Sequence, residues 1–529
     1  MKPGFYKVWI ALPLATALLS CSLPKKTNPC GGGCTNNSTL SLTMIDTPPA
    51  NSSILSFKAT ITGIALNPAT GSSFSLPLTS SPFGANPMIV ELTRLQSDSA
   101  YLGTFTTVPA GTYSSVTVTL ANAQVTFANQ TGATITVGTT TCPTNSVCTV
   151  SGITPIQPSA ISFGTSPLSL SSGSSQGLSL EFNLNNAITL TNGTMALDFS
   201  QAKAVTVATL PRTNSNLSTG QLDLIEDFTG VVTSVTQPSA SSSGSVTLLS
   251  ATRGTLIAKV PSGFSPDDPL ALCGSTVDFT CIKQNQTASA DAILNTDGTL
   301  TLQEIEPLVS STTGPEDLIE GVVDSVSSTN SLLFQLVVSD KELVGSSSQL
   351  AGLNVGDQVQ ITIVSSPSPA SFSVDTKNLN KPGSGFPLTQ LSTFQSAMDN
   401  SVLAAGQTVS VHVPPSSFTA ASGTTIAAAN VNSVMLRWSR ITGTVSTPAP
   451  PNNFNFTPAP FFIPLGVPPN ASISTFGSPP LVQTFSGVTN FDGVTGLTDS
   501  TFNGSTVSIR ALFFRAPSFV FCAARVRKH

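Results

Sequence analysis

The sequence predicts an all-β protein: an N-terminal antiparallel β-sandwich followed by three tandem small β-barrel-like domains, with little helix. Apolar and polar residues alternate with a period of two in many segments, as in GLSLEFNL at residues 177–184. This alternation is typical of half-buried strands. Helical periodicity is almost absent. Short elements also recur in a fixed order through the C-terminal part, which favours tandem domains.

Residues 1–20 are interpreted as a signal peptide. Two lysines precede the apolar run at 8–19, which is shorter than the roughly 20 residues of a membrane-spanning helix. The run ends in LLSC at 18–21, which resembles the lipobox of bacterial lipoproteins. That resemblance implies acylation of Cys21 and cleavage just before it, so the protein would be held at a membrane by N-terminal acyl chains. A plain secretory signal with a chance cysteine is the alternative.

Residues 21–39 are expected to form a lipidated tether, because they are rich in Pro, Gly and polar residues and show no periodicity. Cys30 and Cys34 flank three glycines and could close a small loop; two unpaired thiols are the alternative. Ser22 follows the lipidation cysteine, and in lipoproteins of this kind that favours the outer membrane. We therefore expect an exported, lipid-anchored protein of the cell envelope, located in the outer membrane of a bacterium.

The composition limits the function classes. Charged residues make up 9% of the 529-residue chain, against about 25% in ordinary soluble domains, and the net charge is −5. No basic stripe is present to neutralise phosphates, so we expect no nucleic-acid partner. The 40% hydrophobic content is enough to build cores. The length allows three or four domains.

The first domain is expected at residues 40–212, followed by a linker at 213–225. Four motifs mark it: DTP at 46–48, VEL at 90–92, PAGTY at 109–113 and LDF at 197–199. They resemble a family of bacterial lipoprotein domains known only as domain of unknown function 4382. The resemblance implies no activity. The PAGTY segment itself predicts a tight turn followed by a strand.

Three β repeats are expected, at residues 226–310, 317–438 and 440–529. A first element is centred on Gly230, Gly321 and Gly443, a second on Gly274, Gly406 and Gly504, and the closing strands are TLTLQEIE, SVMLRWSR and FVFCAARV. The fixed order predicts three related small barrels, and chance recurrence is the alternative. The copies resemble a second uncharacterised bacterial module, domain of unknown function 5666.

Two local features add detail to these repeats. The middle copy contains an insertion with an extra strand, LNVGDQVQITI, and a candidate helix at 392–405. Asp297-Gly298 predicts a β-hairpin in the first copy.

Cysteine usage is consistent with export. Cys142 and Cys148 are predicted to form a disulfide, because Pro and Asn favour a turn between them. Cys273 and Cys281 bracket the GSTVDFT segment; an extended strand there would hold them about 26 Å apart, too far to pair. Their pairing is left open, and Cys522 is interpreted as a buried small hydrophobe.

The sequence offers few groups for catalysis or metal binding. Only two histidines are present, so we expect no metal site and no cofactor. Glu304 and Glu306 share one face of a predicted strand, either as paired acids or, more simply, as its solvent face. Trp438 lies between two arginines in MLRWSR and is a candidate ligand contact, although a core position is favoured.

The sequence therefore predicts a non-enzymatic, membrane-anchored lipoprotein that acts as a binding or structural module of the cell envelope. A carbohydrate- or peptide-binding adhesin, with a glycan or protein ligand, is the first alternative. A hydrolase using scattered carboxylates is the second.

Overall fold

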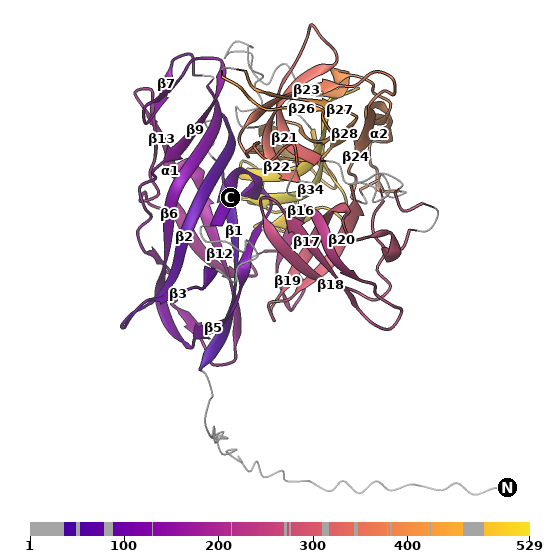
Figure 1. Cartoon of the computed structure of the whole chain (residues 1–529). Coiled ribbons are helices and arrows are strands. Elements are labelled where there is room, and N and C mark those ends of the chain that lie inside the picture. The colour runs from indigo at the N-terminus through magenta and orange to yellow at the C-terminus, as the bar shows by residue number, and fades with distance from the viewer. Residues whose placement is uncertain are drawn as a thin grey trace, which may run out of the picture.

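A computed structural model describes most of the chain after the predicted tether. The described residues are 36–48, 53–78, 88–129, 131–212, 214–268, 272–274, 277–308, 317–342, 348–377, 379–380, 383–423, 425–458 and 481–529. The predicted signal peptide, Cys21, Cys30 and Cys34 lie outside them. The chain is all-β, as expected: a sandwich forms one side of the molecule, and barrel-like domains are stacked against it (Figure 1). No helix within the described ranges is long and apolar enough to span a membrane.

The sandwich consists of two main sheets and one small one. The first sheet has the order β15 (Val205–Leu210), β12 (Ser175–Asn183), β1 (Asn37–Thr47), β5 (Ala100–Pro109). The second follows β10 (Ile161–Ser162), β6 (Gly111–Asn129), β2 (Ser53–Pro68), β3 (Phe74–Ser75), with β4 (Met88–Glu91), β9 (Ser146–Ile153) and β11 (Leu168–Leu170) also paired to it. The small sheet is β13 (Ile188–Thr191), β14 (Thr194–Leu197), β7 (Ile135–Val137), β8 (Thr140–Cys142), and α1 is Leu184–Ala187. The pairs β1–β12 and β14–β7 are parallel, so the sandwich is mainly but not wholly antiparallel.

The central strands β1 and β12 of the first sheet are buried on both faces over most of their length. Leu178, Leu180 and Phe182 of β12 point into the sandwich core, as their alternation predicts. Ser41 and Ser179, on the opposite face, are also buried, at 1% exposure each. This second face is covered because the barrels pack on it, so its polar residues belong to an interface and not to the surface.

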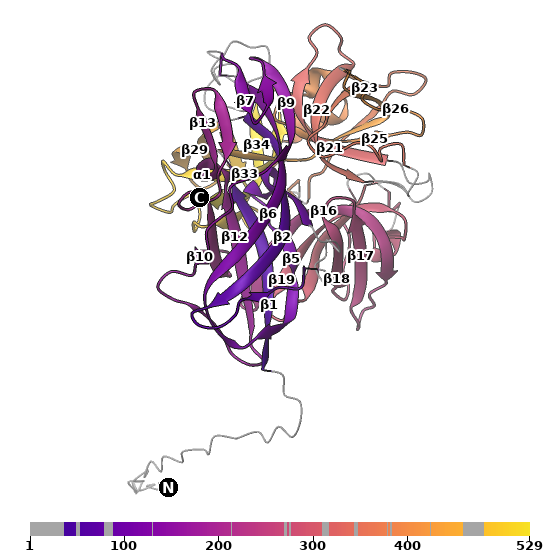
Figure 2. The ribbon, with the colours of Figure 1, turned by 60° about the vertical axis from the view of Figure 1, so that its left-hand side comes forward.

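Barrel one (residues 221–307) is a closed five-stranded barrel (Figure 2). Around the barrel its strands are β16 (Gln221–Thr236), β17 (Gly244–Ser250), β18 (Gly254–Val260), β20 (Leu300–Pro307) and β19 (Thr287–Asn295). Only the pair β18–β20 is parallel. Numbered along the chain, the strand order is first, second, third, fifth, fourth, which is the Greek-key order of the OB-fold.

Barrel three (residues 438–528) repeats this order. Its strands are β29 (Trp438–Ala449), β30 (Asn453–Pro458), β31 (Leu481–Thr484), β34 (Val520–Lys528) and β33 (Thr506–Phe514). The pair β31–β34 is parallel and the other four are antiparallel, as in barrel one. An additional strand, β32 (Asn490–Asp492), pairs with β34.

Barrel two (residues 317–436) has the same order with a divided fifth strand. The strands are β21 (Asp317–Val326), β22 (Leu333–Glu342), β23 (Gln358–Ile363), β27 (Ala427–Val431), β28 (Ser433–Leu436) and β25 (Thr408–Val413). The fifth strand is divided at Asn432: β27 pairs with the third strand and β28 with the fourth. Between the third and fourth strands, the insertion adds β24 (Ser371–Val374), α2 (Leu388–Gln395) and η4 (Asn400–Val402), and β26 (Phe418–Thr419) lies between the fourth and fifth strands. The helix expected at 392–405 is therefore shorter and begins earlier. The expectation that LNVGDQVQITI is an extra strand is wrong, because it contains β23, the third strand of the barrel itself.

One pair of backbone hydrogen bonds recurs between strands one and four of every barrel. In barrel two, the N–H of Val323 donates to Gln407 O and the N–H of Gly406 donates to Val323 O, both at 2.8 Å. The equivalent residues are Val232, Gln286 and Asn285 in barrel one and Val445, Ser505 and Gly504 in barrel three. These contacts set a residue-by-residue correspondence between the three barrels.

The correspondence corrects the expected second element of the first repeat. Asn285, Gly406 and Gly504 all adopt left-handed backbone conformations, with φ of 68°, 89° and 76°. The true equivalent in barrel one is therefore the segment at 285–291, and the expected element at Gly274 is wrong. It was missed because Asn, which tolerates positive φ better than most residues, replaces the glycine.

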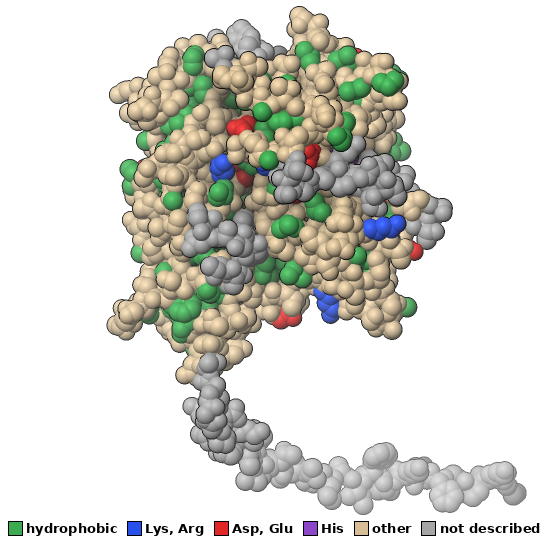
Figure 3. All heavy atoms as spheres, in the orientation of Figure 1, with side chains coloured by type: hydrophobic (Ala, Val, Ile, Leu, Met, Phe, Trp, Pro, Cys, Tyr) green, Lys and Arg blue, Asp and Glu red, His purple; other side chains and the backbone are tan. Residues whose placement is uncertain are grey.

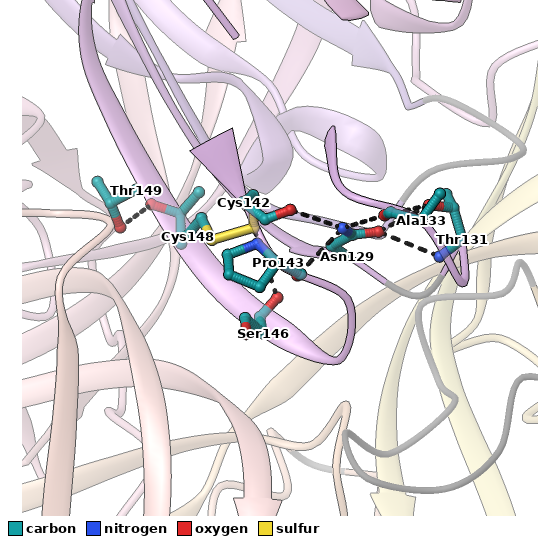
Figure 4. Close-up of a disulfide and its surroundings, with 9 residues drawn as sticks. Asn129, Thr131, Ala133, Cys142, Pro143, Ser146, Cys148 and Thr149 are labelled. Carbon is teal, nitrogen blue, oxygen red and sulfur yellow. Dashed lines mark hydrogen bonds between the residues drawn. A yellow bond between two sulfur atoms is a disulfide. The ribbon is translucent and has the colours of Figure 1, made fainter. Parts of the chain in front are cut away.

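The disulfides follow from local geometry. Cys142 and Cys148 form the expected bridge, and the side chain of Asn129 supports it by donating to Cys142 O at 2.9 Å (Figure 4). Cys273 and Cys281 are also bridged, with Cα atoms 5.0 Å apart, which overturns the expectation that a strand separates them. The chain turns at 272–274 and forms the short 3-10 helix η3 (Phe279–Cys281) instead. Cys522 is a buried free thiol in β34.

The Asp297-Gly298 hairpin is confirmed. It joins β19 to β20, and the N–H of Gly298 donates to Asn295 O at 2.9 Å. Gly298 has a φ of 81°, which a side chain would disfavour.

Candidate functional site

The charged residues of this charge-poor chain gather where the domains meet. The face seen in Figure 3 shows only a few Lys, Arg, Asp and Glu side chains, scattered over an otherwise uncharged surface. A continuous set of ion pairs lies in the interior instead, and we call it the ion network. Its members are Arg94, Asp98, Arg212, Glu226, Asp227, Asp291, Glu306, Glu320, Asp340, Asp375, Lys377, Arg437, Arg440, Asp492, Arg510, Arg525 and Arg527.

Barrels one and three present opposite charges to each other from equivalent strand positions. On strand four, the position of Asp291 in barrel one is occupied by Arg510 in barrel three. On strand five, Glu304 pairs with Asp291 and Arg525 pairs with Arg510. Glu306 and Arg527 occupy the next equivalent position. The corresponding residues of barrel two are His412, Ser433 and Met435.

Arg510 is the centre of the contact between barrels one and three. Its guanidinium lies 2.9 Å from Glu226 and 2.8 Å from Asp227, and it is 2% exposed. Burial alone would raise the pKa of Asp227, but Arg510, Lys377 and Arg440 lower it well below its usual range. Asp227 is therefore ionised in the folded protein.

Trp438 packs against the Arg510 side chain at this contact. It is fully buried, and the Arg510 guanidinium lies over its ring, 4.7 Å from the ring centroid. The candidate surface contact at Trp438 is therefore wrong, because the two arginines beside it turn into the protein and pack barrel three against its neighbours. The favoured core position is the observed one.

Arg437 joins barrel one to barrel two. Its Nη1 lies 2.8 Å from both Glu306 and Asp375. Burial, followed by the nearby Asp375, raises the pKa of Glu306 well above its usual value, and Arg437 opposes this rise. The interpretation of Glu304 and Glu306 as a solvent face is wrong, because barrel two and the insertion cover that face of barrel one.

The sandwich enters the ion network through the short 3-10 helix η2 (Leu92–Gln96) and the turn after it. Arg94 lies 3.0 Å from both Glu320 and Asp340 of barrel two. Asp98 accepts from Arg440 of barrel three at 2.5 Å. One segment of the sandwich thus contacts two barrels through opposite charges.

A cavity of about 280 Å³ opens beside η2, at the junction of the sandwich, barrel one and barrel two. Lys58 and Ile89 line it from the sandwich, Thr252 and Arg253 from barrel one, and Lys341 and Val355 from barrel two. It is therefore a site that no single domain could form.

Three of the cations at this cavity lie outside the ion network. Within the described part of the chain, Lys58, Arg253 and Lys341 take part in no ion pair. Arg253 donates instead to the backbone oxygens of Glu226 and Asp227, and Lys341 to those of two residues in its own barrel. The cavity thus contrasts with the ion network, where cations and acids lie in contact.

Sequence reasoning found neither the ion network nor the cavity. Both depend on which outward strand faces are covered by other domains, and alternation reports only the inward face. One signal was present: aligned repeats place Asp291 and Arg510 at the same position, and opposite charges at equivalent sites indicate complementary surfaces. The misplaced second element concealed that alignment.

Comparison with known protein families gives a match that covers the sandwich. Residues 37–216 match the family described as "Domain of unknown function (DUF4382)", as the motifs at 46–48 and 109–113 led us to expect. No curated protein matches the chain. A solved structure titled "drosophila Unr CSD456" is similar at 9% identity, covering 57% of this chain and 97% of its own, with a TM-score of 0.12. A TM-score this low supports no inference about fold or function.

Proposed function

We propose that this protein is a non-enzymatic binding module of the cell envelope, held at a membrane by acyl chains on Cys21. Its four domains act as one rigid body with a ligand site at their junction. The observation that carries the proposal is the contrast between the ion network, whose charges are mutually neutralised, and the cavity, whose cations are not. Neutralised, buried charges fix geometry, whereas unneutralised cations in a cavity are available to a ligand.

The anchoring part of the proposal is supported by the LLSC motif at 18–21 and by the exported character of the cysteines. Ser22 supports the outer membrane as the location. Incorporation of radiolabelled palmitate in cells tests it: the wild type should be labelled, and Cys21→Ala should not. Labelling that persists in Cys21→Ala would contradict the anchor.

The barrels support a second part of the proposal, that they are related copies of a module resembling domain of unknown function 5666. The shared strand order and the recurring hydrogen bonds at Val232, Val323 and Val445 favour common descent over chance recurrence. Opposite charges on equivalent faces then let two copies pack against each other.

A peptide-binding adhesin is the second candidate. Leu249 and Ile257 are 49% and 63% exposed on the outer face of β17 and β18, the second and third strands of barrel one. Such side chains could contact an apolar peptide. The carbohydrate form of this alternative loses its expected aromatic contact, because Trp438 is buried.

A hydrolase is the least supported alternative. Glu306, Glu320 and Asp227 are buried, and each lies within ion-pair distance of an arginine, so none is free to act on a substrate. Assays of the full chain with ester, glycoside and peptide substrates test this. Turnover that is abolished by Glu91→Gln, the carboxylate at the cavity, would contradict a purely binding role.

A further inference from the structure

We propose that the interdomain cavity binds a small organic oxyanion, a phosphate or carboxylate that carries a short apolar body. This inference rests on the proposed binding function and names the ligand class for the same site. The cationic groups of Lys58, Arg253 and Lys341 would hold the charged end. The apolar residues beside them would contact the body of the ligand.

The three cations come from three different domains. Lys58 lies on β2 of the sandwich, Arg253 in the turn between β17 and β18 of barrel one, and Lys341 on β22 of barrel two. An oxyanion among them would therefore bridge all three domains. Ammonium and guanidinium groups are the side chains best suited to bind phosphate and carboxylate oxygens.

Each of these cations keeps N–H donors that its existing hydrogen bonds do not use. Arg253 uses its two terminal nitrogens on the backbone oxygens of Glu226 and Asp227, and its guanidinium lies 5.1 Å from the ring centroid of Phe228. Lys341 donates to the backbone oxygens of Leu350 and Leu353, which leaves one of its three N–H donors. No described residue accepts a hydrogen bond from Lys58.

Burial disfavours the charged form of two of these groups. Burial, together with the nearby Arg94, lowers the pKa of Arg253 to about 10, which still leaves it protonated. Burial also lowers the pKa of Lys341; the charge of Asp357 opposes this effect, and the like charge of Lys58 adds to it. An anion in the cavity would relieve this repulsion.

Neutral donors hold the one carboxylate among the lining residues, Glu91. Glu91 caps η2: it accepts from the backbone N–H of Phe57 at 2.9 Å, the N–H of Thr93 at 3.0 Å and the hydroxyl of Ser56 at 2.5 Å. Its Oε1 accepts from both N–H groups and its Oε2 from the hydroxyl, and no ion pair joins it to Lys58 in the described structure.

The remaining wall is apolar. Ile89 is 47% exposed on β4, and Val90 and Val355 line the cavity beside it. A cavity of about 280 Å³ with a cationic side and an apolar side matches a short amphiphilic anion better than inorganic phosphate alone.

Titration calorimetry with the purified full chain tests this, with hexyl phosphate as the probe. We expect hexyl phosphate to bind, and inorganic phosphate and hexanol, which each lack one half of the probe, to bind at least tenfold more weakly. Lys58→Gln should weaken the binding of hexyl phosphate by about threefold to tenfold, the loss of one charged contact at a half-exposed position. Lys259→Gln is the matched control, because Lys259 lies exposed at the far end of β18.

The outcomes separate the possibilities. No binding of hexyl phosphate, or equal binding by Lys58→Gln and the wild type, would overturn the inference, and so would equal affinity for inorganic phosphate. Phosphatidylglycerol vesicles distinguish the source of the ligand: competition with hexyl phosphate that depends on Lys58 would identify a lipid headgroup, and its absence a free small molecule. Palmitate labelling of Cys21 is independent of these results. The labelling experiment can therefore contradict the anchor without contradicting the ligand class, and calorimetry can do the reverse.

Discussion

Barrels one and three share a strand order and a recurring hydrogen-bond pair, yet their equivalent outer faces carry opposite charges. Glu226, Asp227 and Asp291 of barrel one form ion pairs with Arg510 and Arg525 of barrel three. The inward faces are alike, because both are apolar and fill a core. The comparison shows that one strand order with an apolar interior accommodates outer faces of opposite charge.

A second contact of barrel three, with barrel two, is made by apolar side chains. Barrels two and three share one apolar cluster that includes Trp438, Leu512 and Phe514, and Phe386 of the insertion packs edge-on against Phe514 with ring centroids 6.0 Å apart. An apolar contact contributes burial without fixing direction, whereas ion pairs need matched geometry. We infer that the ion network sets how the domains are oriented.

Charge reversal at the centre of the ion network should have the largest effect. Arg510→Glu places another acid against Glu226 and Asp227 and should lower the free energy of unfolding by more than about 5 kcal/mol, beyond the loss of a buried pair. Urea unfolding followed by the fluorescence of Trp438 measures it, since the only other tryptophan lies in the predicted signal peptide. An unchanged midpoint would show that the opposite charges do not hold barrels one and three together.

Removal of an unpaired buried acid should stabilise the protein. Asp324 of barrel two is 5% exposed, and burial raises its pKa to about 6, since its hydrogen bond from Gln358 does not offset desolvation. The folded state then binds a proton more tightly than the unfolded state, so stability falls as the pH rises from about 4 to about 6. Asp324→Asn should gain about 1–3 kcal/mol at pH 7 and little at pH 4. If the stability of Asp324→Asn depends on pH as that of the wild type does, Asp324 is not the acid that destabilises the folded protein above about pH 4.

The shared turn before strand four should tolerate glycine and asparagine but not alanine. Gly504→Ala adds a methyl group in open space, so its cost of about 1 kcal/mol comes from the left-handed backbone alone. Asn285→Gly should change the free energy of unfolding by less than about 0.5 kcal/mol. Thermal unfolding compares the two, and equal effects would argue against the equivalence of these turns.

Reversal of a charge outside the interfaces should have the smallest effect on the free energy of unfolding. Lys259→Glu reverses an exposed charge on β18 and should change stability by less than about 0.5 kcal/mol. If this variant is destabilised as much as Arg510→Glu, overall charge and not the buried faces would explain the effect.

The sequence predicted the cores well and the interfaces not at all. The alternation of Leu178, Leu180 and Phe182 identified a strand correctly, because these side chains are buried in the core of their own domain. The same reasoning assigned the other face to solvent, which fails for Glu306 and Ser179, since neighbouring domains cover them. The Cys273–Cys281 bridge and the role of Asn285 were missed for a local reason. The Gly-x-Thr-Val pattern was interpreted as a strand, but the chain turns at 272–274 and forms η3 at Phe279–Cys281. The cavity could not be predicted, because its cations come from three domains.

The contact between Glu226 of barrel one and Arg525 of barrel three tests the central claim most directly. These side chains lie 2.5 Å apart and are buried in different barrels. A double-mutant cycle with Glu226→Gln, Arg525→Met and the combination, measured by urea unfolding, isolates their interaction. If complementary charge orients the barrels, the coupling energy will be at least about 1.5 kcal/mol. A coupling energy near zero would mean that the apolar contacts alone assemble the molecule.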